Sequence, residues 1–472
     1  MVSTEKPPLT RHVAEFVAST RFEDIPADVI DGGRKSILDG LGLAIAGSVA
    51  ESGHIVADYL ADLCAGTAGT CTVLGTDLRT PARFAAFANG VAIHADDYDD
   101  TQLAVAKDRV YGLLMHPTAP ALPAALAAAE STGASGAEFS AAYHIGIEVC
   151  CKIAEAANPR HYQDGFHTTG TCGVFGAAAS AARIAGLGVD EAAAALGLAG
   201  SQSSGFRENF GTMTKPFHPG RSAESGIVAV DLVRRGFSAT HNILEAPRGF
   251  YRAAAGGYDN AAIFGKLGNP WTFVTPGISI KPHPSGSLTH PAMSVTMELV
   301  TANDIRPNDV RRIRIGTNRH MPTTLLHHDP KNELQAKFSM QFSLAILLLR
   351  RRAGLAEYTD AAVTAADTRE QMAKVDFYVN ERADAAGFDK MTSIVDIEMN
   401  DGRVFSGEAD FGKGSPANPM NWQEVVHKFH ECADHGRLPK EKAKDVVRMV
   451  EDLDTIDDVR TLTALMYKGA SH

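Results

Sequence analysis

The chain of 472 residues has 56 acidic against 45 basic side chains, a formal net charge of −11. A balance this acidic argues against a nucleic-acid partner or an anionic membrane surface. With 44% hydrophobic and 21% charged residues, the composition is that of a soluble globular protein, and the length predicts two domains around a large core.

The cysteines and the first residues indicate the compartment. The six cysteines have no CxxC spacing, so we expect buried free thiols and neither disulfides nor an iron–sulfur site. The chain starts without the apolar segment of a signal peptide, and Arg183 and Arg350 interrupt apolar runs short of a membrane span. The sequence therefore predicts a cytoplasmic protein that binds no membrane.

The part of the chain before residue 276 has the periodicity of helices. Ile30, Ile37, Leu41 and Ile45 recur at helical spacing in a segment that starts at Pro26 and ends near Gly47. Ser135 and Glu138 have the spacing of a capping box. We expect further helices over residues 84–93, 117–130, 135–156, 173–187 and 222–235.

The pattern changes near Pro276. Residues 310–315 and 375–379 predict strands, and residues 393–399 and 403–409 predict a hairpin with its turn at Asn400-Asp-Gly402. An apolar helix is expected over 336–349, and helical periodicity returns after Pro419, with Asn421 as an N-cap. We predict a mainly α fold, in which a smaller α/β lid domain (276–411) is inserted into a large helical domain made of both chain ends (1–275 and 412–472).

Residues 94–101, His-Ala-Asp-Asp-Tyr-Asp-Asp-Thr, follow the predicted buried helix 84–93 and are called the acidic turn below. Carboxylates at the end of a buried helix need partners, because an unpaired buried charge costs several kcal/mol. If the helix continues, Asp97 and Thr101 lie on one face and contact the same ligand. Asp97 would then act as a general base, and Thr101 would bind a substrate oxygen. A solvated acidic loop is the alternative.

Candidate partners of the acidic turn are short segments rich in His, Lys and Arg. His116 and His167 each precede a predicted helix, where an imidazole beside N-terminal amides suits a carboxylate or a developing enolate. Lys215, His218 and Arg221 lie within seven residues directly before the predicted 222–235 helix, a pattern that indicates an anion site. A purely structural role is the alternative for any single histidine.

The segment Lys281-Pro-His-Pro-Ser-Gly-Ser-Leu-Thr-His290 repeats this theme where the two predicted domains meet. His290 precedes Pro291 and a predicted helix, whereas His283 lies in a proline-bounded loop beside Ser285. A domain boundary is a favoured place for a ligand cleft.

A metal site is the rival interpretation of the acidic turn. Residues 96–100 superficially match the aspartate-rich Mg²⁺–diphosphate motif of helical prenyl-transfer enzymes. The sequence offers no second motif of this kind, since Asp457-Asp458 has no third acidic residue at a suitable spacing, and HExxH is absent. We therefore predict no metal site.

The acidic turn and the basic segments described above, in their order along the chain, resemble the MmgE/PrpD family. This family includes 2-methylcitrate dehydratase, cis-aconitate decarboxylase and iminodisuccinate epimerase. The resemblance is carried by residues 89–101, 116–117, 165–167, 213–221, 281–290 and 336–339. It implies a homodimer of a large helical domain and a smaller lid domain, without metal or organic cofactor. By position it implies catalytic roles for Asp97, Thr101, His116, His167, Lys215 and His290, with substrate contacts expected from His94, His218, Arg221, Lys281, His283 and Ser285.

The chain departs from the family pattern in two places. The segment 102–115 is longer than expected and carries Lys107, Asp108 and Arg109, which could reshape substrate selection. Phe342 stands where many members have a tyrosine, and its side chain has no hydroxyl proton to donate.

The chemistry implied by the resemblance makes or breaks a carbanion beside a carboxylate. Lys215, assisted by Arg221 and helix N-termini, is expected to stabilise the enolate-like state, and one of the histidines to move the proton. We expect a cofactor-independent hydro-lyase acting on a di- or tricarboxylate, similar to 2-methylcitrate dehydratase. An epimerase, a decarboxylase and a non-catalytic carboxylate-binding protein are the open alternatives.

Overall fold

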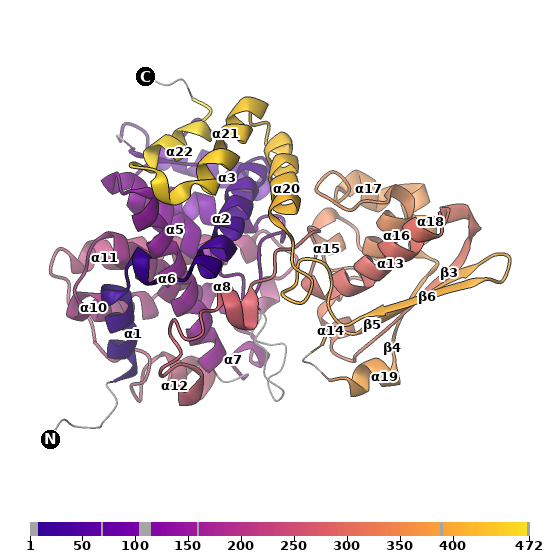
Figure 1. The fold of residues 1–472 in the computed structure, drawn as a ribbon, viewed down its shortest axis with the longest axis horizontal. Coiled ribbons are helices and arrows are strands. Elements are labelled where there is room, and N and C mark those ends of the chain that lie inside the picture. The colour runs from indigo at the N-terminus through magenta and orange to yellow at the C-terminus, as the bar shows by residue number, and fades with distance from the viewer. Residues whose placement is uncertain (1–7, 68, 103–114, 158–159, 388–389, 470–472) are drawn as a thin grey trace.

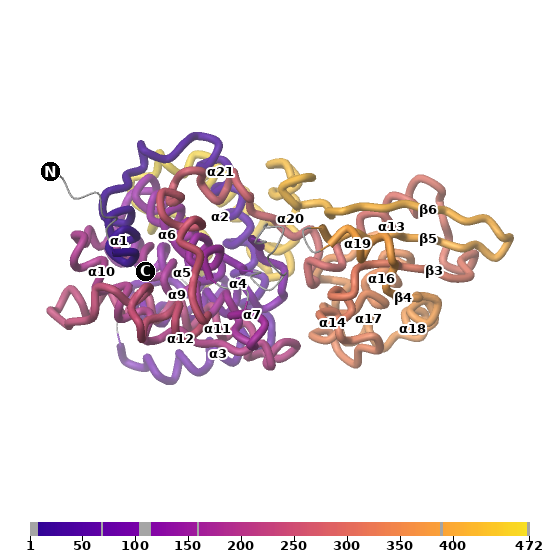
Figure 2. The backbone as a smooth tube through the Cα atoms, turned by 90° about the horizontal axis from the view of Figure 1, so that it is seen from below, coloured from indigo at the N-terminus to yellow at the C-terminus, as the bar shows by residue number. Residues whose placement is uncertain are grey.

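The computed structural model describes residues 8–67, 69–102, 115–157, 160–387 and 390–469. Figure 1 shows two lobes side by side, and the view from below in Figure 2 shows the same separation. The first and last helices both belong to the larger lobe, whereas the middle of the chain forms the smaller one. Helices predominate in both lobes, so the predicted mainly α fold is confirmed.

The large lobe is a bundle of helices from both halves of the chain. Its longer helices are α1 (Leu9–Ser19), α2 (Ala27–Gly47), α3 (Glu51–Leu63), α4 (Ala82–His94), α5 (Thr118–Thr132), α6 (Gly136–Ala156), α9 (Gly173–Ile184), α10 (Val189–Gly200), α11 (Thr214–Val233), α20 (Trp422–His435) and α21 (Lys440–Glu451). Shorter elements are α7 (Arg160–Gln163), α8 (Thr168–Thr171), α12 (Phe250–Ala255), α22 (Arg460–Leu465) and the strand pair β1 (Cys71–Thr72) and β2 (Arg79–Thr80).

Local sequence signals explain several of these helices. The predicted capping box begins α6: the Ser135 hydroxyl accepts from the Glu138 N–H at 3.2 Å, and the Glu138 carboxylate accepts from the Ser135 N–H at 2.8 Å. Asn421 caps α20 in the same way with Glu424. All six cysteines are buried and free, as predicted.

The small lobe contains a four-stranded sheet in the order β4-β3-β5-β6. Its strands are β3 (Val310–Thr317), β4 (Val375–Val379), β5 (Ser393–Met399) and β6 (Val404–Ala409), and its helices are α13 (His290–Ala302), α14 (Met321–Thr324), α15 (Glu333–Ala336), α16 (Met340–Arg350), α17 (Asp360–Thr364), α18 (Ala366–Met372) and α19 (Glu381–Ala385). β3 pairs parallel with β4, and β5 and β6 form the predicted antiparallel hairpin. Residues of β5 alternate between buried and half-buried, which fits a sheet packed on one face against α13 and α16.

Each lobe has its own hydrophobic core. The core of the large lobe joins residues from Leu9 to Ile280 with residues from Met420 to Met466, and the core of the small lobe runs from Leu288 to Met399. The domain boundaries at 276 and 411 stay a prediction. No single helix of the described residues is both long and apolar enough to cross a membrane, although the bent pair α2 and α3 meets these criteria when taken together.

Two predicted helices have different bounds in the structure. The predicted 222–235 helix starts earlier, at Thr214. Pro216 falls in its first turn, where the missing N–H breaks no helical hydrogen bond, whereas Pro219 lies inside the helix. The predicted 336–349 helix is divided into α15 and α16. Between them, the Ser339 hydroxyl accepts from the Phe342 N–H at 3.2 Å and starts α16 anew.

Candidate active site

The acidic turn lies beside the start of α11 because α4 and α11 approach each other closely. At the crossing, a Cβ atom added to Gly90 would lie 2.7 Å from the Gly220 Cα atom, so a side chain there would force the helices apart. This contact joins the helix that leads into the acidic turn to the helix that carries Lys215 in its first turn.

The acidic turn leaves the helix at His94, so the predicted continuation of the helix to Thr101 is wrong. Asp97 has a φ of 50°, in the left-handed region that aspartate tolerates better than most residues. The main chain then turns away, and Thr101 pairs with Ser279 on the connection between the lobes. Asp97 and Thr101 therefore line two different pockets rather than one helical face.

Two ammonium groups contact the buried Asp97. Lys215 Nζ donates to Asp97 Oδ1, and Lys281 Nζ lies 3.2 Å from Oδ2 and donates to the Asp97 carbonyl oxygen at 2.7 Å. Burial favours a raised pKa of the Asp97 carboxyl, but the two ammonium groups outweigh burial and hold this pKa below its usual range. Asp97 is thus a weak base, and its position between two cations favours an orienting role over general-base catalysis.

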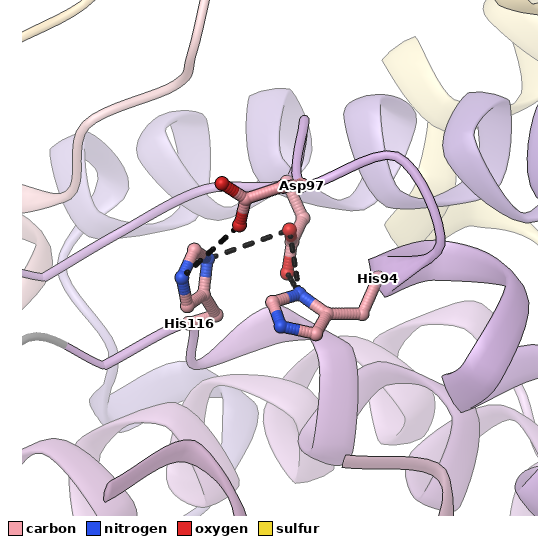
Figure 3. A group of neighbouring side chains, drawn as sticks. His94, Asp97 and His116 are labelled. Carbon is pink, nitrogen blue, oxygen red and sulfur yellow. Dashed lines mark hydrogen bonds and ion pairs between the residues drawn. The ribbon is translucent and has the colours of Figure 1, made fainter. Parts of the chain in front are cut away.

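His94, Asp97 and His116 lie close together (Figure 3), and the Asp99 carboxylate contacts both histidines. His94 Nδ1 lies 2.8 Å from Asp99 Oδ1, and His116 Nδ1 lies 3.4 Å from the same oxygen. The other ring nitrogen of His116, Nε2, lies 3.7 Å from Asp97 Oδ1. Asp99 therefore orients His116 through Nδ1 and leaves Nε2 on the side of Asp97.

Burial keeps the imidazoles of this region neutral. It lowers the pKa of His116, and the ammonium groups of Lys215 and Lys281 add to this effect against the opposing Asp99 carboxylate. Burial and Lys215 also hold the pKa of His167 well below its usual range. Neutral His116 and His167 can accept a proton, and a bound polycarboxylate would raise both pKa values by adding negative charge.

One pocket between the lobes brings together five of the predicted residues. Asp97, His116, His167, Lys215 and Lys281 line it, and each is at most 5% exposed. The remaining lining residues are Tyr162 and Phe210 of the large lobe and Gly286, Ser287, Leu288, Thr324, Leu325 and Phe338 of the small lobe. A pocket that combines a few charged and polar groups with apolar side chains is typical of sites for small organic ligands.

Four further predicted residues lie next to this pocket. Thr101 and His290 line an adjoining pocket, which shares Lys281 and Ser287 with the first. His94 and His218 line neither pocket. His94 contacts Asp99, and His218 Nδ1 lies 2.9 Å from His167 Nδ1, so both support residues around the pocket.

Three residues predicted to contact the substrate line neither pocket, and their substrate contacts stay a prediction. Arg221 is on the outer side of α11, half-exposed, where its guanidinium donates to Glu224. His283 Nδ1 donates to the Ala353 carbonyl oxygen at 2.9 Å and faces a different cleft. The Ser285 hydroxyl lies 2.9 Å from the Thr289 hydroxyl, and Ser285 lines neither pocket.

The two departures from the family pattern have different outcomes. Phe342 is fully buried, packs edge-on against the Tyr358 ring at 5.0 Å between centroids, and lines neither pocket. A role in substrate choice through direct contact is therefore not supported. Lys107, Asp108 and Arg109 lie outside the described residues.

Two buried lysines that the sequence prediction missed hold the acidic turn. Lys337, in the Ala-Lys-Phe-Ser segment of the small lobe, lies 2.9 Å from Asp96 Oδ1. Lys428 of α20 lies 2.6 Å from Asp39 Oδ1 and donates to the Tyr98 carbonyl oxygen at 2.8 Å. Lys337 belongs to a segment already singled out in the sequence, whereas nothing around Lys428 indicates its contact.

Two family models match this sequence over most of its length. The MmgE/PrpD N-terminal domain matches residues 11–262, and the MmgE/PrpD C-terminal domain matches residues 283–455. The chain belongs to the MmgE/PrpD family. Similar relatives include the cis-aconitate decarboxylases of Homo sapiens (27% identical, covering 98% of this chain and 95% of the relative), Mus musculus (27%; 98% and 94%) and Aspergillus terreus (24%; 98% and 97%).

Two histidines and two aspartates in this region also have the composition of a metal site. Ligand atoms of His94, Asp97, Asp99 and His116 lie within 4.8 Å of one another, and all four residues are buried. Asp97, however, already contacts the ammonium groups of Lys215 and Lys281. A divalent cation there would lie next to two positive charges, so the residues fit a hydrogen-bonded network better than a metal centre.

We therefore expect treatment with EDTA followed by dialysis to leave turnover within about twofold of that of the untreated protein, because the two ammonium groups at Asp97 disfavour a metal ion between these side chains. The measurement is kcat/KM before and after treatment, together with metal analysis of the protein. Loss of turnover that returns on addition of Mg²⁺ or Zn²⁺ would contradict this expectation.

Asp100 ties the acidic turn to the start of α5, just after His116. Its carboxyl accepts from the Thr118 N–H at 3.2 Å and from the Thr118 hydroxyl at 2.6 Å. Burial raises the pKa of Asp100 to about 7, against the lowering effect of the Thr118 hydroxyl. The folded-state pKa thus lies above the value of roughly 3.9 expected in an unfolded chain.

Because the pKa of Asp100 is raised in the folded state, the protein should lose stability as pH rises. The contribution of Asp100 is complete below the unfolded pKa and is lost as pH rises through about 7. Asp100→Asn keeps an acceptor for the Thr118 N–H but no longer titrates, so its free energy of unfolding relative to wild type should rise between about pH 5 and about pH 8. Urea unfolding at both pH values measures this difference, and an unchanged difference would show that Asp100 is ionised throughout.

Proposed function

We propose that this chain is a lyase that makes or breaks a carbanion beside a carboxylate of a small tricarboxylic acid. One observation carries the proposal: the ammonium groups of Lys215 and Lys281 flank Asp97 in a pocket that neutral His116 and His167 also line. A carbon next to a carboxylate is a very weak acid, so fixed cations must stabilise the enolate-like state that forms on it.

In this proposal the substrate carboxylate binds at Lys215 and Lys281, which together with Asp97 leave one net positive charge in the pocket. His116 is the first candidate for proton transfer, because Asp99 orients its Nδ1 and its Nε2 lies on the side of Asp97. The apolar side chains Phe210, Leu288 and Phe338 exclude water from the bound substrate, which strengthens each of these charge interactions.

Decarboxylation of a substrate such as cis-aconitate is the first candidate reaction, because relatives named for it align with 98% of this chain. The bond from carbon to the departing carboxylate breaks, CO₂ leaves, and the electron pair stays on carbon, where Lys215 stabilises it. An imidazole that has taken up a proton from solvent then transfers this proton to the carbon. Dehydration, the reaction expected from the sequence, is the second candidate. There an imidazole takes the proton from carbon, and hydroxide leaves from the neighbouring carbon.

Incubation with cis-aconitate, citrate, 2-methylcitrate and iminodisuccinate in D₂O tests the proposal. Release of CO₂ with one deuterium in the product indicates a decarboxylase, and an ultraviolet-absorbing alkene formed from a hydroxy acid indicates a dehydratase. Deuterium next to a carboxylate without net conversion indicates an epimerase. If these acids bind but none is converted or exchanged, the proposed lyase is wrong and the chain is a carboxylate-binding protein.

A further inference from the structure

Tyr162 lines the first pocket, although the sequence prediction did not single it out. It belongs to the short helix α7, is 8% exposed and lines the same cavity as Asp97 and Lys215. Among the described residues that line this pocket, Tyr162 is the only one with a phenol. The pocket thus has an aromatic side chain with a hydroxyl group for which the proposed reaction gives no role.

Main-chain hydrogen bonds hold the segment of Tyr162 against the segment that begins at Gly205. The His167 N–H donates to the Gly205 carbonyl oxygen at 3.0 Å, and the Arg207 N–H donates to the Gly165 carbonyl oxygen at 2.8 Å. These two bonds bring Arg207 next to Tyr162 and tie both residues to His167, which lines the same pocket as Tyr162. The position of Arg207 is therefore set by the main chain.

The guanidinium group of Arg207 lies against the ring of Tyr162. Its Cζ atom is 3.7 Å from the ring centroid, a cation–π contact, and its Nη1 donates to the Tyr162 carbonyl oxygen at 3.1 Å. The same Cζ atom is 5.8 Å from the ring centroid of Phe210, which also lines the pocket. Because the planar guanidinium stacks on the ring, it holds the Tyr162 side chain in one orientation.

Arg207 also brings a positive charge that no carboxylate neutralises. None of the described residues forms an ion pair with it, and its buried Nε has no hydrogen-bond partner among them. The two lysines and the aspartate of the pocket leave one net positive charge, so Arg207, behind the Tyr162 ring, raises the total to two. Two net positive charges attract a substrate that has more than one carboxylate.

The phenol of Tyr162 is protonated at neutral pH. Burial raises its pKa, and the Asp97 carboxylate adds to this effect against the opposing Arg207 guanidinium. A protonated phenol donates a hydrogen bond, and a carboxylate is a stronger acceptor for it than a neutral oxygen. The hydroxyl therefore suits an anionic group of a ligand in this pocket.

We propose that Tyr162 and Arg207 form a specificity-determining pair, in which the Tyr162 hydroxyl donates to a substrate carboxylate other than the one held at Lys215. Arg207 holds the ring and attracts the same carboxylate through its charge. This inference rests on the proposed function and deepens it: the pair selects a substrate with a further carboxylate over an acid that lacks it.

Binding of three unreactive acids tests the pair without any turnover. Tricarballylate has three carboxylates, glutarate and 2-methylsuccinate each lack a different one of them, and calorimetry on the purified chain gives a Kd for each acid. Wild type should prefer tricarballylate to both diacids. Tyr162→Phe should reduce the preference over one of the two diacids about tenfold, the effect of one lost hydrogen bond to a charged group, because the ring and its contact with Arg207 remain.

Variants of Arg207 separate its charge from a merely structural role. Arg207→Gln removes the charge and should reduce the same preference as Tyr162→Phe. Arg207→Lys keeps the charge without the planar stack, and it should recover part of that preference. Lys215→Ala should instead weaken the binding of all three acids, because it removes the cation that holds their shared carboxylate.

Tyr258→Phe is the matched control. It removes the hydroxyl of a half-buried tyrosine that stacks on the Tyr251 ring at 4.6 Å and lines neither pocket, so it should keep the wild-type preference. Equal affinity of wild type for the three acids, no binding of any of them, an unchanged preference in Tyr162→Phe, or no difference between Arg207→Gln and Arg207→Lys would overturn the pair. Failure to convert any acid in D₂O would overturn the proposed lyase instead, and a preference lost in Tyr162→Phe would still support the pair.

Discussion

Lys215→Ala will lower kcat/KM by at least ~10²-fold while the protein stays folded, the scale of a lost electrostatic contact to a transition state. The Lys215 ammonium group is 5.3 Å and 5.6 Å from the ring centroids of Phe210 and Phe338, and the residue is 5% exposed. Water therefore screens its charge poorly, and it acts at full strength on a negative charge that develops in the pocket. The fold should survive, because Asp97 keeps its contact with Lys281.

The control for Lys215→Ala is Lys374→Ala, which removes a half-buried lysine that pairs with Glu370 outside both pockets. It should keep wild-type kcat/KM. Lys215→Arg keeps the charge but changes the geometry, and we expect it to recover only part of the activity. Near wild-type turnover of Lys215→Ala, with a thermal unfolding midpoint like that of wild type, would remove Lys215 from the mechanism.

The elements that follow from local sequence were predicted well. The capping boxes at Ser135 and Asn421 and the hairpin at Gly402 each depend on a few neighbouring residues, whose side chains or φ angle determine where an element starts or turns. The bounds that were wrong depend on context. Pro216 and Pro219 suggest a loop, yet α11 includes both.

The residues of the candidate site were predicted only in part, because their arrangement also depends on the context that the fold provides. Their chemical types and order along the chain indicate carboxylate chemistry and the family, and five of them meet in one pocket. The sequence does not specify which side of a helix faces that pocket. Lys215 and Arg221 lie on one helix, yet only Lys215 reaches Asp97, whereas Arg221 pairs with Glu224 on the outer side.

Contacts between distant segments were beyond the sequence prediction. Lys337 and Asp96 are 241 positions apart, and Lys428 and Tyr98 are 330 apart, so no local pattern connects them. Both lysines hold the acidic turn from outside, one from the small lobe and one from α20. Their contribution is visible only once the two chain ends and the middle of the chain have been brought together.

Asp97→Asn will destabilise the protein by roughly 3–5 kcal/mol, the scale of a buried charge left without its partner. Asparagine tolerates the φ of 50° at this position, so the change removes charge without backbone strain. The folded-state pKa of Asp97 is lowered by Lys215 and Lys281 despite burial. Its stabilising contribution is therefore present above the usual carboxyl range and is lost as pH falls. The deficit of Asp97→Asn in urea unfolding should be largest at neutral pH.

The double variant Asp97→Asn, Lys215→Met separates stability from catalysis. Removing the Lys215 ammonium group as well as its partner leaves fewer uncompensated charges, so at least ~1 kcal/mol of the lost stability should return, a coupling of the size found between contacting residues. Activity should not return, because both an orienting carboxylate and a stabilising cation are then missing from the pocket. Strictly additive losses of stability in the two single variants would show that Asp97 and Lys215 do not stabilise each other, and the charge arrangement on which the site depends would be wrong.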